Sequence, residues 1–152
     1  MKTPWMEMTL RDFQAALASS SPTPGGGTAA AIALGQASAL AIMVCDLTLG
    51  KDKWKDGWDI ADKTLSESVG IMMRAGALAD EDSDAFDEVM ASFKLPKETE
   101  TEKESRRYAI RQATLGATEK PFETAQLALK LLELLPELAI KGNSNAASDV
   151  GV

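Results

Sequence analysis

Residues 28–49 read TAAAIALGQASALAIMVCDLTL, and almost every position in this stretch is Ala, Ile, Leu, Met or Val. Small residues recur at every fourth position, at Ala31, Gly35 and Ala39, so a second helix backbone can approach this face closely. The pattern therefore predicts a long apolar helix against which other helices pack.

The same stretch must be weighed as a membrane span, because a span needs about 18 or more consecutive apolar residues. Three polar side chains, Gln36, Ser38 and Asp46, interrupt the run, and the rest of the sequence has no second apolar run of that length. Ionisable side chains are rare inside membrane spans. We therefore expect the central buried helix of a soluble domain, with no membrane partner.

The residues before this helix predict a shorter helix and a loop. Thr9 is a suitable N-cap for a helix through Ala18, and Asp12 places a carboxylate near its positive end. Segment 19–27 holds two prolines, three serines and three consecutive glycines, which favour turns. The first helix should bury one face, which carries Leu10, Phe13, Ala16 and Leu17.

The residues after the central helix predict further helices. A polar turn at 50–57 precedes a long helix that Pro96 ends. An acid-rich helix start follows at 98–103, and Pro121 either begins the next helix or kinks a continuous one. A leucine-rich helix then covers 122–140. The residues expected to be buried are Ile60, Leu65, Val69, Met72, Met73, Leu78, Ala109, Ile110, Ala113, Ala117, Leu127, Leu131, Leu134 and Leu138.

Composition indicates a single all-α domain over residues 1–152. With 45% apolar residues the chain can form one hydrophobic core and is short of what two domains usually need. No strand pattern or internal repeat is evident, so we expect an antiparallel bundle of five to six helices. The net charge of −7 has the wrong sign for a nucleic-acid or anionic-lipid surface. A single cysteine and no secretory-signal pattern fit a cytoplasmic protein.

The absence of histidine restricts the chemistry further. It removes the usual metal ligand and the side chain that titrates nearest neutral pH, so we expect no metal site and no histidine triad. The lone Cys45 in an apolar helix reads more readily as a buried residue than as a nucleophile. Proton transfer must therefore use Asp, Glu, Lys, Tyr, Cys or water.

Two polar stretches are candidates for a site. Gly25–Gly27 precede Thr28 and a helix, which leaves free backbone N–H groups for an anion or carbonyl oxygen. The alternative is a flexible turn that lets Thr28 cap the helix. No strand precedes the glycines and no P-loop lysine follows, so both nucleotide motifs are rejected. The four aspartates within 80–87 form either a solvated acidic face or the source of a catalytic carboxylate.

Five short motifs occur in order along nearly the whole chain. They are Ser21–Ala30, Asp82–Phe86, Leu95–Lys97, Glu102–Lys103 with Arg106, and Gly142–Asn143 with Asn145, Ser148 and Asp149. Together they resemble the cyclodeaminase family, which comprises the C-terminal domain of formiminotransferase-cyclodeaminase and stand-alone bacterial relatives, some described as methenyltetrahydrofolate cyclohydrolases. The resemblance implies an all-α homodimer that takes a tetrahydrofolate derivative as substrate and has no tightly bound cofactor.

The resemblance implies one of two reactions. In a cyclodeaminase, folate N10 attacks the formimino carbon on N5, ammonia leaves, and the 5,10-methenyl bridge forms; a cyclohydrolase hydrolyses that bridge. Both need a base for the nucleophile and an acid for the leaving group, which carboxylates can supply. We place the cyclodeaminase first and the cyclohydrolase second.

Individual roles follow from the resemblance. Asp82 would be the acid or base and Asp149 a second catalytic group, while Lys97 and Arg106 would orient the folate carboxylates. The remaining substrate contacts would come from Gly25, Gly26, Gly27, Thr28, Asn143 and Asn145. From the residues alone, the two asparagines equally suit local turn bonding and helix capping.

Two further expectations concern the whole chain. Family members continue past Asp149 with another helix, which a chain ending at Val152 would lack. The alternative from another class is a non-catalytic helical module that self-associates through the Ala31, Gly35 and Ala39 face. An enzyme should bind reduced folate and change the methenyl absorbance, whereas a scaffold should do neither.

Overall fold

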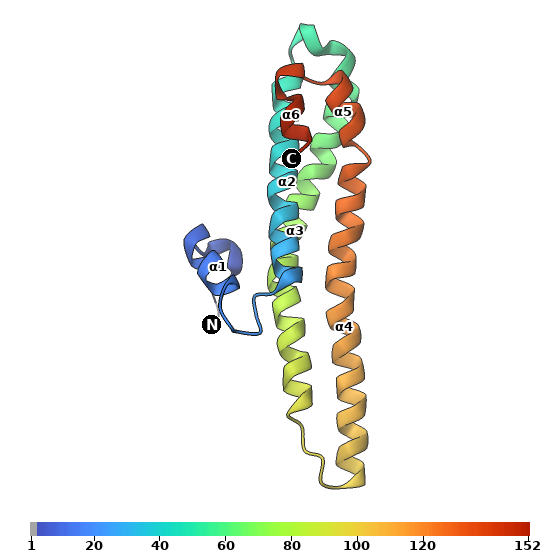
Figure 1. Ribbon diagram of the computed structural model, residues 1–152. Coiled ribbons are helices and arrows are strands. Elements are labelled where there is room, and N and C mark those ends of the chain that lie inside the picture. Colours follow the sequence, from blue (N-terminus) through green and yellow to red (C-terminus); the bar gives the residue numbers. More distant parts are fainter. Residues whose placement is uncertain (1–2) are drawn as a thin grey trace. The chain divides into compact units, whose positions relative to one another are not determined.

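The computed structural model describes residues 3–152, and the regular secondary structure of this part of the chain is helical throughout (Figure 1). The predicted all-α class is confirmed. The α-helices are α1 (Leu10–Leu17), α2 (Gly26–Thr48), α3 (Trp58–Phe93), α4 (Glu100–Leu132), α5 (Leu135–Lys141) and α6 (Ala147–Val150). The 3-10 helices are η1 (Trp5–Glu7), η2 (Asp52–Gly57) and η3 (Ser144–Ala146).

The chain forms two compact units. The first contains the described residues up to Ile32 together with Gly76–Thr124, and the second contains Ala33–Ala75 and Ala125–Val152. Each of the three long helices, α2, α3 and α4, contributes residues to both units. The single domain predicted over residues 1–152 stays a prediction.

The core of the second unit forms where α2 and α3 run antiparallel. Val44 of α2 shares a cluster with Ile60 near the start of α3, and Leu34 shares one with Ile71 further along. This order of contacts makes the two helices antiparallel, as predicted. The leucine-rich run near the C-terminus completes both clusters with Leu131, Leu134 and Leu138.

Small residues bring α2 and α3 close together within the second unit. A Cβ atom on Gly35 would lie 3.8 Å from Cβ of Ala75, a side chain with no exposed surface. The predicted close packing at Gly35 is therefore confirmed. Ala39, on the same face, is exposed, so self-association of a non-catalytic module through this face stays a prediction.

Two glycines permit close backbone contacts around η2 and α5, also in the second unit. A Cβ atom on Gly57 would lie 2.7 Å from the carbonyl carbon of Lys141, and one on Gly142 would lie 2.5 Å from the carbonyl oxygen of Leu138. Thr48, at the end of α2, accepts a hydrogen bond from the backbone N–H of Asn143 at 3.0 Å. These contacts join the C-terminal turn to the end of α2.

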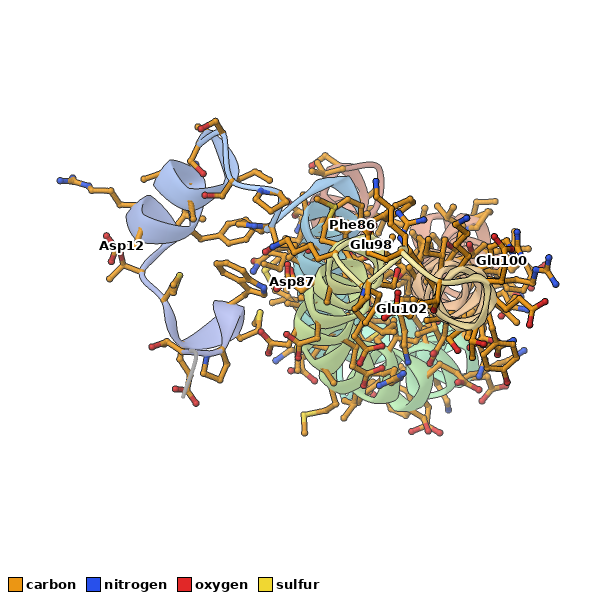
Figure 2. The ribbon with its side chains drawn as sticks, turned by 90° about the horizontal axis from the view of Figure 1, so that it is seen from below. Asp12, Phe86, Asp87, Glu98, Glu100 and Glu102 are labelled. Atoms are coloured by element: carbon orange, nitrogen blue, oxygen red, sulfur yellow. The ribbon has the colours of Figure 1, made fainter. Side chains whose placement is uncertain are left out.

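The N-terminal part of the first unit begins with η1 and α1. Thr9 caps α1 as predicted, because its hydroxyl accepts a hydrogen bond from the backbone N–H of Asp12. Phe13 is buried, but Leu10 and Leu17 are exposed, so the predicted apolar face buries mainly one residue. Figure 2 shows Asp12 on the side of α1 that points away from α3.

The connection between α3 and α4 also lies in the first unit. Helix α3 ends at Phe93, before Pro96, and α4 begins after Thr99. The Thr99 hydroxyl accepts a hydrogen bond from the backbone N–H of Glu102 at 3.2 Å, and the Glu102 carboxylate accepts one from the N–H of Thr99 at 2.9 Å. This reciprocal capping box holds the pKa of Glu102 below its usual value. Figure 2 shows Glu102 with Glu98 and Glu100 around this helix start.

Several helix boundaries differ from the sequence-based expectation. Pro121 lies inside a continuous α4, so it does not begin a new helix. The leucine-rich run is divided by a turn at residues 133–134, after which α5 begins with Pro136 in its first turn. The four-residue α6 forms after the turn that follows residue 142.

The buried stripe of α3 also differs from the prediction. Val69 and Met73, expected to be buried, are 44% and 72% exposed. The stripe passes instead through Thr64 and Ser68, both without exposed surface. The buried stripe of α3 in this unit therefore includes small and hydroxylated residues beside the apolar side chains of Ile60 and Ile71.

Within residues 3–152, one helix, α2, has the length and apolar composition of a membrane span. The core helix of a soluble protein meets the same criterion, so this finding is weak evidence for a membrane. Ala31, Ala41, Val44 and Cys45 of α2 have almost no exposed surface.

Candidate active site

A cavity of about 420 Å³ lies within the first unit. Its volume is in the range of small-molecule sites, which span roughly 300–1,000 Å³. Three segments meet at its walls: the loop that leads into α2, the middle of α3 and the middle of α4. The lining residues are Pro22, Thr23, Gly25, Gly26, Gly27, Asp82, Phe86, Ala117 and Pro121.

The glycine loop forms the wall at the N-terminal end of α2. The helix begins at Gly26, and its first backbone bond runs from the N–H of Ala29 to the carbonyl of Gly25 at 3.0 Å. The N–H groups before Ala29 therefore have no partner within the helix. They add the positive end of the helix dipole to this wall. The predicted backbone platform at Gly25–Gly27 does line the cavity.

Asp82 reaches this wall from α3. Its Oδ2 atom accepts a hydrogen bond from the Thr28 hydroxyl at 3.0 Å. A Cβ atom on Gly27 would lie 2.6 Å from Cγ of Asp82, so only glycine at position 27 leaves room for the carboxylate. The negative carboxylate thus lies against the first turn of α2, where the helix dipole favours it. Asp82 is the one ionisable side chain among the cavity-lining residues that the structure describes.

Thr28 lies behind this carboxylate. Its side chain has no exposed surface, and its hydroxyl contacts Asp82 and the Ser83 hydroxyl. The structure therefore supports neither of the two roles considered for Thr28 from the sequence, which were a direct substrate contact and an N-cap of α2. Its hydroxyl instead donates to Asp82, the catalytic candidate. Two neighbouring aspartates also accept hydrogen bonds. Asp80 accepts one from the backbone N–H of Trp5, and Asp87 accepts one from the Thr23 hydroxyl.

The two cations assigned to the folate carboxylates lie elsewhere in the first unit. Lys97 is exposed on the connection between α3 and α4. Arg106 donates from Nη2 to the carbonyl oxygen of Phe93 at 3.1 Å, and its guanidinium lies 5.6 Å from the centre of the Phe93 ring. This contact satisfies a carbonyl at the C-terminal end of α3. Neither cation lines the cavity, and their role towards folate stays a prediction.

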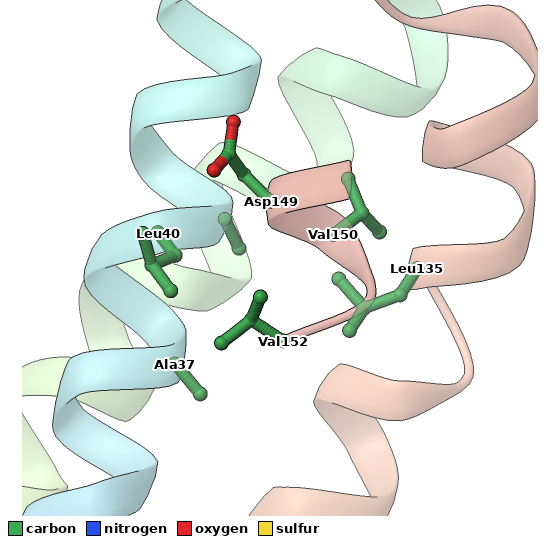
Figure 3. Close-up of a pocket in the computed structure, with 7 residues that line it drawn as sticks. Ala37, Leu40, Leu135, Asp149, Val150 and Val152 are labelled. Carbon is green, nitrogen blue, oxygen red and sulfur yellow. The ribbon is translucent and has the colours of Figure 1, made fainter. Parts of the chain in front are cut away.

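The remaining predicted residues belong to the second unit. Asp149 lines an apolar pocket of about 30 Å³, a volume close to that of one water molecule, and Figure 3 shows it beside Leu40 of α2. Asn143 donates from its side chain to the carbonyl of Leu47 and accepts the backbone N–H of Asn145. The turn-bonding interpretation of the asparagines is therefore what the structure shows. Catalysis by Asp149 stays a prediction.

Five lining residues, Pro22, Thr23, Phe86, Ala117 and Pro121, were not assigned a role in the site from the sequence. Phe86 follows Asp82 by four residues on α3, and Ala117 precedes Pro121 by four on α4, so each pair shares a helix face. This four-residue spacing is the sequence signal from which a shared helix face could have been predicted. Pro121 has no N–H group and cannot give the Ala117 carbonyl its usual helical hydrogen bond, which leaves an acceptor on a residue of the cavity wall.

Other chemistry receives less support from the described residues. Burial, with a smaller contribution from the Asp46 charge, raises the pKa of the Cys45 thiol to about 11. The thiol therefore stays protonated near neutral pH, when a nucleophile would need the thiolate. Over residues 3–152 there is no group of three or more His, Cys, Asp or Glu side chains placed to hold a metal ion.

Comparisons with known proteins agree on one group of relatives. The family model described as formiminotransferase-cyclodeaminase matches residues 9–152. A methenyltetrahydrofolate cyclohydrolase of Methylorubrum extorquens is 40% identical over 144 residues, which cover 95% of this chain and 69% of that protein. The formimidoyltransferase-cyclodeaminase of Rattus norvegicus is 32% identical over 97% of this chain, which spans only 27% of the rat protein.

A solved structure shows the same fold. The crystal structure of formiminotetrahydrofolate cyclodeaminase from Thermotoga maritima matches with a TM-score of 0.81 at 28% sequence identity. The match covers 95% of this chain and 68% of that one. Both the sequence and the fold are thus shared with enzymes named for reactions of folate one-carbon units.

Proposed function

The chain belongs to the formiminotransferase-cyclodeaminase family, and from that premise we propose that it converts the one-carbon unit of a tetrahydrofolate derivative in the cavity beside Asp82. The observation that carries the proposal is the placement of Asp82, which faces a cavity of about 420 Å³ and is held by Thr28 against the first turn of α2. A carboxylate in this position can exchange protons with a bound ligand.

Hydrolysis of the 5,10-methenyl bridge is the reaction we place first. This reverses the order expected from the resemblance, because the relative of which the chain covers 69% is named a cyclohydrolase. The methenyl bridge is cationic, so the Asp82 carboxylate attracts it electrostatically. Asp82 then removes a proton from water as the oxygen bonds to the bridge carbon. It returns that proton to N5 as the carbon–N5 bond breaks, and the second water proton goes to solvent, which leaves the formyl group on N10.

Cyclodeamination is the second candidate, because the matching solved structure is a formiminotetrahydrofolate cyclodeaminase. Here the formimino group reacts in its protonated form, –CH=NH2+. Asp82 takes the N10 proton as N10 bonds to the formimino carbon and delivers it to the NH2 group. The carbon–nitrogen bond then breaks, ammonia leaves, and the positive charge stays on the methenyl bridge. The same carboxylate serves both reactions. The two differ in whether water or N10 attacks, and therefore in what the cavity holds beside the bridge carbon.

The test is an absorbance assay that offers each substrate separately to the purified chain. Hydrolysis removes the methenyl chromophore, whereas cyclodeamination of the formimino compound creates it and releases ammonia. Loss of the chromophore without ammonia release supports the first reaction, and the converse supports the second. If neither signal appears and a titration with reduced folate shows no binding, the chain does not carry the proposed function.

We further propose that the protein is a cytoplasmic homodimer that uses folate as substrate and holds no tightly bound cofactor. Large apolar side chains that remain exposed along α4 support a partner surface. They are Leu115, Phe122, Leu129 and Leu132, each more than half exposed.

A further inference from the structure

A chain of hydrogen bonds leads from the N-terminal segment to Asp82, all within the first unit. The Trp5 indole Nε1–H donates to Oγ of Ser83 at 3.0 Å. The hydroxyls of Ser83 and Thr28 are 2.9 Å apart, and Thr28 donates to Oδ2 of Asp82 at 3.0 Å. Trp5 thus reaches the catalytic candidate through two intervening hydroxyl groups.

The donors in this series of hydrogen bonds all point in one direction. An indole N–H can donate but cannot accept, and each hydroxyl has a single proton to donate. Because the proton of Thr28 goes to Asp82, the bond between the two hydroxyls must be donated by Ser83. Every donor in the series therefore points towards the Asp82 carboxylate.

The three residues that connect to Asp82 through these hydrogen bonds are shielded from water. Thr28 and Ser83 have no exposed surface, and Trp5 is 6% exposed. Trp5 is itself fixed at two further points, because its backbone N–H donates to Oδ1 of Asp80 at 3.0 Å and its ring meets the edge of Phe13. Buried hydrogen bonds of this kind do not exchange readily with solvent partners, and each is costly to break.

We propose that Trp5, Ser83 and Thr28 are positioning residues that engage Oδ2 of Asp82 and fix the orientation of the carboxylate, so that Oδ1, beside Gly27, exchanges protons with the substrate. The proposal rests on the proposed function only where it speaks of substrate. Trp5 precedes residues 9–152, which the family model matches, so the inference extends the site to the N-terminal segment.

Other charges near Asp82 come from two helices. On α3, Asp80 accepts the Trp5 N–H, Glu81 pairs with Lys120 of α4 at 2.9 Å, and Asp84 is exposed. The loop at Gly25–Gly27 carries no ionisable side chain. Changes to the three positioning residues leave all these charges in place, so a change in kcat reports on the hydrogen bonds.

The experiment compares Thr28→Val with Thr28→Ser, because valine keeps the approximate shape of threonine and serine keeps its hydroxyl. Turnover of these variants is measured together with urea unfolding of Thr28→Val, of Asp82→Ala and of the protein that carries both changes. We expect Thr28→Val to lower kcat by about tenfold with little change in KM, the size expected for losing one hydrogen bond to a charged group. Thr28→Ser should restore kcat. The effects of Thr28→Val and Asp82→Ala on unfolding should not add, because each change removes the same hydrogen bond.

Trp5→Phe provides a second test that does not touch the carboxylate directly. It removes the indole N–H but keeps an aromatic ring, and should lower kcat by a smaller amount, again with little change in KM. A folded Thr28→Val protein with the wild-type kcat, or with an effect on unfolding that simply adds to that of Asp82→Ala, would overturn the proposal. If Thr28→Val does not fold, an unchanged kcat in Trp5→Phe overturns it instead. The unfolding measurements need no turnover, so inactivity of the wild type on both folates would count against the proposed function alone.

Discussion

At the scale of single residues, Asp82 has room for its carboxylate because Gly27 has no side chain. A side chain there would place carbon 2.6 Å from Cγ of the carboxylate. The obstacle is the end of a side chain and not backbone, so Asp82 can rotate away at modest cost to stability. We expect Gly27→Ala to retain its fold, lose the Thr28 to Asp82 hydrogen bond, and lose most of its activity.

Activity and thermal unfolding of Gly27→Ala, measured together, check this expectation. Gly70→Ala is the matched control, because a Cβ atom at that exposed position of α3 meets nothing within 4 Å. The control should keep full activity and gain about 0.5–1 kcal/mol, since alanine favours helix more than glycine does. Full activity in Gly27→Ala would show that the tight contact has no catalytic importance.

The carboxylate itself can be replaced without changing its shape. Asp82→Asn keeps the side-chain volume and the contact with Thr28 but cannot take up a proton. We expect kcat to fall by roughly 10²–10⁴-fold, the usual contribution of a general acid or base, with little change in unfolding temperature. Unchanged turnover in a well-folded Asp82→Asn protein would remove Asp82 as the leading catalytic residue.

Cys45 links one buried residue to the pH dependence of stability. Its pKa is raised from 9.0 to about 11 in the folded protein, mainly by burial. The folded state therefore binds the thiol proton more tightly than the unfolded chain, so this contribution is complete below pH 9 and disappears as pH rises towards 11. Between pH 9 and pH 11 we expect the free energy of unfolding to fall by about 2 kcal/mol more in the wild type than in Cys45→Ala. Urea unfolding at each pH measures this difference. Parallel pH curves for the two proteins would argue against a buried, protonated thiol.

The sequence predicted this site in part. The glycine loop and Asp82 were both assigned to the site from the sequence, because short motifs can indicate a residue's role. Burial of Thr28 was not predictable, since a threonine after glycines suits a cap or a ligand contact equally well. Its neighbour Ser83 is separated from it by 54 intervening residues, and only the pairing of α2 with α3 brings the two hydroxyls to 2.9 Å.

At the scale of elements, the close contact between α5 and the residues around it gives a stability test. A Cβ atom on Gly142 would meet the Leu138 carbonyl oxygen at 2.5 Å and the Thr48 hydroxyl at 3.1 Å, and backbone cannot move away as a side chain can. We expect Gly142→Ala to lower the free energy of unfolding by about 2 kcal/mol, as overpacking commonly does. Urea unfolding measures this, and a stability equal to the wild type would mean that the turn adjusts freely.

The helices themselves were predicted more accurately than the faces they bury. The start and end of α1 and the end of α2 agree with the capping and turn residues, whose effects are local. Helix α2 begins at Gly26, inside the stretch predicted as a loop. The buried stripe of α3 was misassigned because pattern analysis follows large apolar residues, whereas the stripe uses Thr64 and Ser68. The break between α4 and α5 was missed because residues 133–134 carry no glycine and their leucine continues the apolar pattern.

At the scale of the whole molecule, the balance of charge and exposed apolar surface bears on assembly. A net charge of −7 keeps copies of the chain apart at long range, but salt screens this repulsion. The exposed leucines and Phe122 of α4 favour association once copies approach. We expect sedimentation at moderate salt to give twice the 16.2 kDa mass of one chain, and Phe122→Lys to reduce the dimer fraction. A monomer at all concentrations would contradict the proposed homodimer.

Trp5 gives the protein a natural optical reporter. Its indole is almost wholly shielded from water and donates its only N–H to Ser83, so its fluorescence depends on a local field that includes the Asp82 charge. With the other two tryptophans, Trp54 and Trp58, replaced by phenylalanine, emission comes from Trp5 alone. Detachment of the N-terminal segment would then appear as a shift to longer wavelength, so the integrity of the site can be followed in solution without any substrate.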